Sequence, residues 1–395
     1  MGQEVERFLT EKSKVGAEPK PLVLDLHKES DQTKLKKLIA ENKIQHVADD
    51  YEEQLREYFQ VQNPAIVYAP NFEDEFQKHL VGLKAEAPLW QQGRWVYFPW
   101  ISTLAHILED EAFQLVRTAR NRNLITQEEQ EKFYNATIGI AGLSVGNSVV
   151  LAIVLQGGAK RIKLADHDRL ALTNTNRIRS GVDNLGVLKV EMTARQIYLL
   201  NPYAEVELYP EGLTKENISN FFEGLDIVVD ELDNLAIKYC IREQARKHRI
   251  AVVMGADNGD NAVIDVERYD ENPAQEFFHN RMGEVTYEGL AGLDKFGIGK
   301  KIAQHIGVET VTEAALSSFL QIGKTVVSWP QLGGAALLNG CAIAYCVRKI
   351  LNKQPLESNR ALISMDEMLD PNYNKPEEVQ RRSNAAAEFR KVFGL

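Results

Sequence analysis

The chain is poor in cysteine, with only Cys240, Cys341 and Cys346 among its 395 residues. None of them forms a Cys-x-x-Cys pair, which excludes a structural zinc site built on two such pairs, so we expect no zinc. Few cysteines and the lack of a secretory signal favour the cytoplasm. All three lie in segments of helical character, and we expect each to be a packed core side chain rather than a nucleophile.

Other absences narrow the class of protein. The chain has no internal repeat and no low-complexity tract. Its net charge of −10 makes nucleic acid an unlikely partner. The longest weakly polar run, residues 332–347, is interrupted by Asn339 and is too short for a membrane span, so we expect a buried helix and no membrane partner. An apolar content of 44% allows a large core, which fits one large domain and one smaller domain.

Segments of strand and helix character alternate from residue 137 onward. This order predicts an α/β domain with a doubly wound, mostly parallel, Rossmann-like sheet. Residues 261–270 alternate between apolar and polar, which predicts an antiparallel extension of that sheet. The predicted strands are 137–141, 161–165, 206–209, 226–229, 250–254 and 361–365. The predicted helices are 187–200, 215–222, 234–248 and 333–351.

The first 110 residues predict a smaller α+β domain, and residues 111–395 predict the main domain. We expect residues 1–20 to be irregular, because they are charged and show no apolar periodicity. The aromatic run at 93–100 fits either a peptide-binding surface or, more commonly, a small buried sheet. The other expected elements are a strand at 21–26 and helices at 31–41, 48–60, 102–122 and 127–134.

The clearest functional signal follows the strand at 137–141. A turn with Gly142 and Gly146 leads from this strand into a helix, so backbone N–H groups and a helix N-terminus can face a phosphate. The match to Gly-x-Gly-x-x-Gly is incomplete, because Leu143 replaces one glycine and Ala141 another, and a plain strand–helix turn is the alternative. The next strand ends at Asp166, where an acidic residue can hold ribose hydroxyls.

Polar and cationic residues gather after this unit. Asp168 comes two residues after the strand end, Asn174 and Asn176 precede Arg177, and Lys189 opens a helix. The planar guanidinium of Arg177 suits phosphate oxygens, and a lysine at a helix N-terminus opposes the helix dipole unless an anion is near. An enzyme that breaks a triphosphate needs two such cations, whereas a dehydrogenase does not. Solvated loop acids and an ordinary surface lysine are the alternatives.

A second cluster of carboxylates ends the predicted strand at 226–229. Asp230, Glu231 and Asp233 are followed there by Asn234. Carboxylates at this edge of an open α/β sheet lie beside the ligand crevice, and Asp233 can hold Mg²⁺ through oxygen ligands. Capping of the next helix by Asp233 or Asn234 is the alternative, and the two roles can coexist.

In these motifs the chain resembles the ThiF/MoeB/HesA adenylating enzymes, which are relatives of the ubiquitin-activating enzyme. The resemblance covers about residues 120–269. The family has an acid-x-acid motif, then Ser-Asn-x-x-Arg, Gly-x-x-Lys and Asp-Asn, which are matched in order at 166–168, 173–177, 186–189 and 233–234. An arginine segment that precedes the first strand in the family is matched by "ARNRNLI" at 119–125. The joint order of these motifs is far more specific than the glycine turn.

The resemblance implies ATP as the nucleotide and Mg²⁺ as the metal. It implies that Asp166 holds the ribose and that Asp233 positions Mg²⁺. It also implies that Arg177 and Lys189 stabilise the triphosphate, together with an Arg122 that reaches across a homodimer. The remaining implied nucleotide contacts are Gly142, Gly146, Asp168, Asn174 and Asn176. We expect Arg177 and Lys189 to be exposed to a cleft.

We therefore predict an ATP- and Mg²⁺-dependent adenylating enzyme that converts a carboxylate on a protein or peptide into an acyl-AMP and releases pyrophosphate. A peptide-modifying enzyme of a ribosomal natural-product pathway, acting on a side-chain carboxylate, and a catalytically inactive nucleotide-binding partner subunit are the alternatives. The acidic charge disfavours a tRNA-modifying dehydratase, and the clustered cations disfavour an NAD-dependent oxidoreductase. The segment 280–325 contains no cysteine, so we expect the second nucleophile to come from elsewhere.

Overall fold

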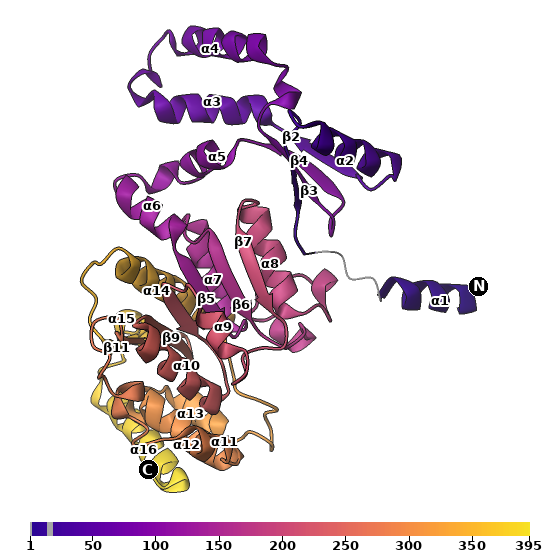
Figure 1. Cartoon of the computed structure of the whole chain (residues 1–395). Helices are drawn as coiled ribbons and strands as arrows, with labels where there is room; N and C mark the ends of the chain where they lie inside the picture. The colour runs from indigo at the N-terminus through magenta and orange to yellow at the C-terminus, as the bar shows by residue number, and fades with distance from the viewer. Residues whose placement is uncertain (1, 14–18) are drawn as a thin grey trace. The chain divides into compact units, whose positions relative to one another are not determined.

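The computed structural model describes residues 2–13 and 19–395, and its course is shown in Figure 1. The chain forms two compact units. The N-terminal unit comprises the residues up to 127 together with 194–204, and the main unit comprises 128–193 together with 205–395. We retain the division into domains of residues 1–110 and 111–395 as a proposal, since compactness alone does not test it.

The N-terminal unit contains a small mixed sheet whose strand order is β1-β3-β4-β2. Neighbouring strands are antiparallel except for β2 and β4, which are parallel. The strands are β1 (Leu22–Leu24), β2 (His46–Asp49), β3 (Arg94–Phe98) and β4 (Thr103–Ile107). The helices are α1 (Gly2–Ser13), α2 (Glu29–Ala40), α3 (Tyr51–Gln62), α4 (Phe72–Glu86) and α5 (Asp110–Arg117).

The aromatic run belongs to the core of this small sheet. Trp95 and Tyr97 of β3 are buried, and the Trp95 ring stacks on His106 of β4 with the ring centroids 4.2 Å apart. Of the two interpretations of this run, the buried sheet is therefore confirmed, because the aromatic rings of β3 are buried inside the unit.

Two expectations for the N-terminal unit are wrong, and one helix was missed. Residues 103–107 form β4 rather than part of a helix, since their alternating burial and their pairing with β3 outweigh local helix propensity. Helix α1 replaces the expected irregular start, although residues 14–18 of that prediction lie outside the described residues. The sequence also did not indicate α4, whose Phe76 and Leu80 complete the cluster under α3.

The main unit is built on a sheet with the strand order β11-β10-β9-β8-β5-β6-β7. The five strands from β7 to β9 are parallel, and β10 and β11 extend the sheet in antiparallel pairing. The predicted fold, a doubly wound and mostly parallel sheet with an antiparallel extension, is confirmed. The strands are β5 (Thr137–Ala141), β6 (Arg161–Ala165), β7 (Glu205–Tyr209), β8 (Ile227–Asp230), β9 (Ala251–Asn258), β10 (Asn261–Glu267) and β11 (Asn359–Ile363).

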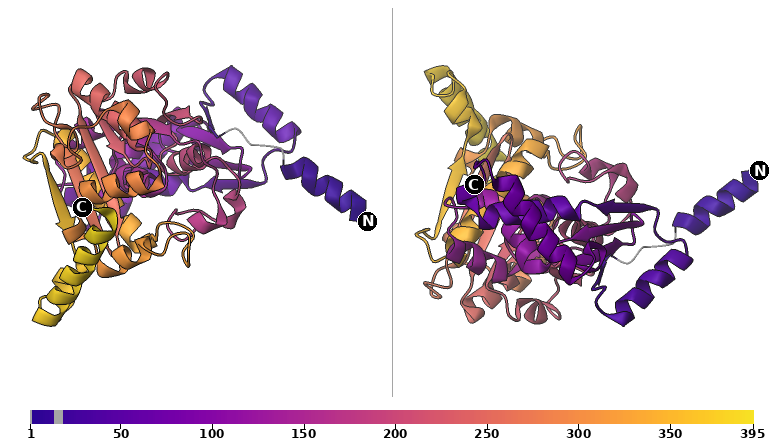
Figure 2. Two further views of the ribbon diagram at one scale, coloured as in Figure 1. Left: turned by 90° about the horizontal axis from the view of Figure 1, so that it is seen from below. Right: turned by 90° about the horizontal axis from the view of Figure 1, so that it is seen from above.

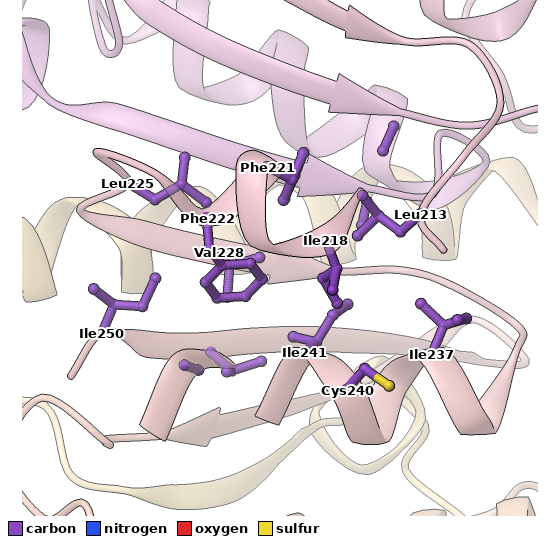
Figure 3. Packing of buried hydrophobic residues seen from close by; sticks show 14 of the residues in the cluster. Leu213, Ile218, Phe221, Phe222, Leu225, Val228, Ile237, Cys240, Ile241 and Ile250 are labelled. Atoms are coloured by element: carbon purple, nitrogen blue, oxygen red, sulfur yellow. The ribbon is translucent and has the colours of Figure 1, made fainter. Parts of the chain in front are cut away.

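Helices cover both faces of this sheet. Val252 of β9 belongs to the cluster formed with α9 (Ile218–Phe222) and α10 (Leu235–His248), which Figure 3 shows through Phe222, Cys240 and Ile241. Gly255 of the same strand approaches α14 (Gly333–Leu351) instead. Because side chains alternate along a strand, Val252 and Gly255 point to opposite faces. Every residue of β5 and β8 is buried, because helices cover both faces of these central strands. Burial on both faces accounts for their largely apolar sequences.

Helix α14 packs against α7 (Val145–Leu155) and against β9 and β10. Among the residues that the structure describes, α14 is the one helix with the length and apolar character to cross a membrane, and half of that stretch is buried inside the main unit. The helix predicted at 333–351 is confirmed, and its 19 residues make it longer than the weakly polar run 332–347, which alone was judged too short for a membrane span. Its expected burial as a core helix is supported by Ala336, Ile343 and Val347.

Residues 280–325 contain short helices. They pack as a separate cluster with the C-terminal helix, which the sequence did not indicate, and both views of Figure 2 show that helix in yellow beside the orange segment. The ring contact between Phe319 and Phe389 joins them. The remaining helices of the chain are α6 (Gln127–Asn135), α8 (Lys189–Leu200), α11 (Tyr287–Ala291), α12 (Lys295–Ile306), α13 (Glu313–Phe319), α15 (Met365–Leu369) and α16 (Pro376–Phe393).

Candidate nucleotide-binding site

The carboxyl ends of β5 and β8 meet at the point where the strand order of the main unit reverses. Gly142 follows β5 with φ at +87°, and a Cβ placed there would lie 2.3 Å from the backbone oxygen of Glu231, which follows β8. Both the left-handed backbone and the close approach therefore require glycine at residue 142. In open α/β sheets ligands bind in the crevice at this switch point.

Gly146 lies buried in the first turn of α7. A Cβ at this position would lie 3.1 Å from Cγ2 of Ile140, which is tighter than ordinary packing. The two glycines that remain from the expected motif thus have distinct roles: Gly142 brings the turn against β8, and Gly146 brings the helix against β5. The resulting turn directs the N-terminus of α7 toward the crevice.

Asp166 stabilises this turn directly. Its Oδ2 accepts a hydrogen bond from the backbone N–H of Leu143 at 2.7 Å, and its Oδ1 accepts one from the backbone N–H of Asp168 at 2.8 Å. The side chain is buried at the end of β6. Each oxygen retains a further lone pair, so contact with a ribose is compatible with this arrangement and stays a prediction.

Lys189 is buried, which corrects the expectation that it is exposed to a cleft. Its Nζ lies 2.7 Å from Oδ2 of Asp168 and 3.6 Å from Oδ2 of Asp166. The hydrogen bond from Lys189 lowers the pKa of Asp168. The anion near this helix N-terminus is therefore supplied by the chain's own carboxylates. Among the described residues, Asp166, His167 and Asp168 also bring one possible metal-ligand atom each within 4.8 Å of the others.

Arg177 is half-buried beside the nucleotide turn. Among the described residues, its three hydrogen bonds all go to neutral oxygens: Nε donates to Ser144 Oγ, and Nη1 donates to Thr173 O and Asn176 Oδ1, each at 3.0 Å. Burial lowers the pKa of Arg177, an effect that the negative charges of Asp257 and Asp233 oppose through space. The guanidinium is thus held in place without a bonded carboxylate, which leaves its charge available to an anion.

The two predicted asparagines lie in the loop that carries this arginine. Asn174 Oδ1 accepts a hydrogen bond from the backbone N–H of Ala171 at 2.9 Å and so orders the loop. Asn176 Nδ2 donates to the backbone oxygen of Gln331 at 2.8 Å. Both side chains therefore shape the loop in this structure, and their direct contact with a nucleotide stays a prediction.

The acidic residues after β8 divide between structure and site. Asp230 is fully buried and pairs with Lys238 and Arg242. Burial raises the pKa of Glu231 well above its ordinary value, and its Oε1 accepts a hydrogen bond from the backbone N–H of Gly255 at 2.7 Å. These two carboxylates serve the packing of the sheet edge rather than a solvent-exposed ligand site.

Asn234 caps α10, with its side-chain oxygen accepting from the backbone N–H groups of Ala236 and Ile237 at 3.0 and 3.1 Å. Asp233 is exposed, and its side chain has no hydrogen-bond partner among the described residues. Magnesium takes oxygen ligands, often one or two carboxylates together with substrate phosphates. An exposed, unbonded carboxylate at this strand end fits the predicted role of Asp233 as a Mg²⁺ ligand.

Sequence reasoning missed three residues of this site. Ser144 bonds Arg177, and Asp257 and Gln331 bond each other, with Gln331 Nε2 donating to Asp257 Oδ2 at 3.2 Å. Burial raises the pKa of Asp257. Asp257 could have been found, because it stands near the carboxyl end of β9, where the same strand-edge argument applies. Gln331 lies 154 positions after Arg177 in the sequence, so no local pattern links them.

Arg122 belongs to the N-terminal unit. It follows a short 3₁₀ turn and is exposed, while the buried Ile125 and a left-handed Asn123 with φ at +72° close the loop behind it. The loop therefore presents the arginine to solvent on the surface of that unit. Its contribution to a neighbouring subunit stays a prediction.

The cysteines differ in exposure. Cys240 and Cys346 are buried, as expected, and burial raises the pKa of Cys346 to about 11. The expectation of a core position is wrong for Cys341, which is exposed on α14 and lines a hollow of about 700 Å³ with Leu337 and Met365. Leu337 and Tyr345 on the same helix are also exposed.

Comparison with known proteins shows which sequences the chain is similar to. Residues 118–316 match the model of the ThiF family. Uncharacterized protein MT1398 of Mycobacterium tuberculosis is 33% identical over 305 residues, which cover 76% of this chain and 42% of that protein. The tRNA threonylcarbamoyladenosine dehydratase of Bacillus subtilis is 31% identical over 35% of this chain and 57% of its own. The sulfur carrier protein adenylyltransferase of Thermus thermophilus is 28% identical over 33% and 48%. The chain thus spans less than two thirds of each relative.

Proposed function

Because the chain belongs to the ThiF family, we propose that it is an ATP- and Mg²⁺-dependent adenylating enzyme. In the proposed reaction, a carboxylate oxygen of the substrate attacks the α-phosphorus of ATP. The bond from that phosphorus to the bridging oxygen breaks, and acyl-AMP and pyrophosphate are the products. The observation that carries the proposal is the state of Arg177. This half-buried cation is held only by neutral oxygens, and it lies beside the glycine turn that leads into the N-terminus of α7.

The residues of the main unit would act by positioning and charge stabilisation. The first turn of α7 would receive phosphate on its backbone N–H groups, since the N–H groups of Gly142 and Leu143 already donate to Ala165 and Asp166. Arg177 would stabilise the negative charge that develops on the departing pyrophosphate. Lys189, paired with two carboxylates, would contribute less free charge than Arg177. Asp233 would hold Mg²⁺, which supplies neutralisation of the phosphate charge.

We propose a carboxylate on a protein or peptide as the substrate. Support comes from a relative named for adenylating a sulfur carrier protein. A second relative is named for dehydrating a modified tRNA base, but the net charge of −10 disfavours nucleic acid as the partner of this chain. A side-chain carboxylate of a peptide is the alternative substrate. An inactive partner subunit is disfavoured because the cations and Asp233 are all present. We place the enzyme in the cytoplasm as part of this proposal.

The nucleotide is the first point to test. Calorimetric titration is expected to show that ATP with Mg²⁺ binds more tightly than NAD, because the site holds a free guanidinium suited to a triphosphate. Exchange of labelled pyrophosphate into ATP, measured with candidate carboxylate substrates, then tests the chemical step. NAD binding as tight as ATP binding would refute the proposal.

Assembly is the second point. We propose a two-fold symmetric homodimer in which Arg122 serves the nucleotide site of the partner. Arg122→Ala and Asp233→Ala chains are each expected to be inactive alone, whereas a mixture should regain pyrophosphate exchange, because a mixed dimer carries one intact site. Each variant incubated with itself is the control. A dimer that exchanges subunits, as seen by light scattering, without recovery of activity would place Arg122 outside the partner's site.

A further inference from the structure

The segment that leads into α14 contacts the loop of Arg177. The backbone oxygen of Gln331 accepts a hydrogen bond from Asn176 Nδ2 at 2.8 Å, and Asn176 Oδ1 in turn accepts one from Arg177 Nη1 at 3.0 Å. The side chain of Gln331 donates to Asp257 at 3.2 Å. A continuous chain of hydrogen bonds therefore runs from the end of β9 to the guanidinium of Arg177.

The approach of this segment to the loop is close. A Cβ placed on Gly333 would lie 2.4 Å from the backbone oxygen of Asn176. Glycine is required there by the lack of space, since any side chain would collide with the backbone of the loop. The contact fixes the distance between the start of α14 and the residue next to Arg177.

The other end of the chain is anchored in the core. Asp257 Oδ1 accepts a hydrogen bond from Asn339 Nδ2 at 2.7 Å, and Asn339, which is fully buried in α14, also donates to Ala335 O at 3.1 Å. The carboxylate of Asp257 therefore accepts amide donors from α14 on one oxygen and from Gln331 on the other. Gln331 is thus tied to a rigid part of the main unit.

Such an anchor matters because of how Arg177 is held. A free arginine side chain loses rotamer entropy when it is fixed, and no bonded carboxylate fixes this one. Its orientation depends instead on weak neutral partners, one of which, Asn176, is itself oriented by Gln331. A guanidinium that must meet developing negative charge acts best when it is already in place.

We propose that Gln331 is a positioning residue for Arg177, which it orients through Asn176 from its anchor on Asp257. The inference deepens the proposed function and rests on it in one respect: Arg177 is taken to bind phosphate. Gln331 itself touches neither nucleotide nor substrate in this scheme. Its effect should therefore disappear when Arg177 is absent.

The test is a double-mutant cycle on the full chain. Gln331→Met keeps the length of the side chain and removes its donor, so it is expected to lower the affinity for inorganic pyrophosphate with Mg²⁺ about fivefold, the scale of one neutral hydrogen bond. Asn176→Ala is expected to lower it by about tenfold, because two hydrogen bonds of the chain are lost. In an Arg177→Ala background, Gln331→Met should cause no further loss. Gln380→Ala, which removes a bond between exposed side chains on α16, is the matched control and should leave binding unchanged.

Calorimetric binding is the readout because it does not depend on turnover. If Gln331→Met lowers the affinity for pyrophosphate equally with and without Arg177, Gln331 has a general structural role and the inference is wrong. If Gln331→Met has no effect on binding, the inference is wrong as well. If the unaltered protein shows no pyrophosphate exchange but the double-mutant cycle gives the expected binding results, adenylation is refuted and the positioning role of Gln331 is retained.

Discussion

Replacing Arg177 by alanine is expected to slow the exchange of pyrophosphate into ATP by about 10²-fold or more, the scale of one preorganised donor to developing charge. The fold should survive, because the hydrogen bonds that Arg177 makes go to neutral groups at the rim of the crevice. Exchange rates of purified variants, with circular dichroism to check folding, measure this effect.

Arg177→Lys is the matched variant. It keeps the charge and loses the planar fork, so it should recover only part of the activity. Lys189→Ala is also expected to slow exchange, but it leaves the buried Asp166 without its nearby cation and should lower stability as well. An Arg177→Ala chain with a normal exchange rate would assign this residue to the surface and would remove the main support for the proposed function.

The largest expected effect on stability comes from Arg242, beneath the site. Its guanidinium is fully buried, pairs with Asp230, and donates from Nε to Glu267 Oε2 at 2.9 Å. Arg242→Met should lower the free energy of unfolding of the main unit by about 3–5 kcal/mol, because Glu267 loses its cationic partner and keeps only neutral donors, and Asp230 keeps only Lys238 as a cation. Urea unfolding, followed by circular dichroism in the far ultraviolet, measures the change in the free energy of unfolding.

Arg381→Met provides the control for this prediction. Arg381 pairs with Glu313 and Glu378 on the surface, and such exposed pairs contribute about 0–1 kcal/mol. If Arg242→Met lowers the free energy of unfolding as little as Arg381→Met does, the buried network is hydrated or dispensable. A large loss would instead show that the end of β8, from which Asp233 projects, depends on the charge balance inside the sheet.

The strands of the main unit could be predicted well because burial on both faces leaves a mark in the sequence. β5 and β6 were predicted residue for residue: β5 is buried along its whole length, and β6 alternates Arg161 and Lys163 with the buried Ile162 and Leu164. Short or exposed elements carry no such mark. β2 is exposed along its length, and β4 is defined by its pairing with β3, so both were hidden among apparent helices.

The site shows the same division. The sequence places Gly142, Asp166 and Asp233 at or just beyond strand ends, and the ends of parallel strands meet at one edge of the sheet. Arg177 lies in the loop that follows Asp166, and Lys189 begins the helix after that loop. What the sequence by itself determined is therefore which of these residues follow the strand ends, and their joint role in nucleotide binding stays a prediction.

Only the tertiary structure decided how those side chains pair. It placed Lys189 against Asp168 and Asp166, left Arg177 without a bonded carboxylate, and brought Gln331 to the arginine loop. The physical reason is that strand character and helix character depend on neighbouring residues, whereas hydrogen bonds and ion pairs between distant segments depend on the path of the whole chain. Contacts such as that of Asn176 with Gln331, 155 positions apart, exist only after the sheet and its covering helices have formed.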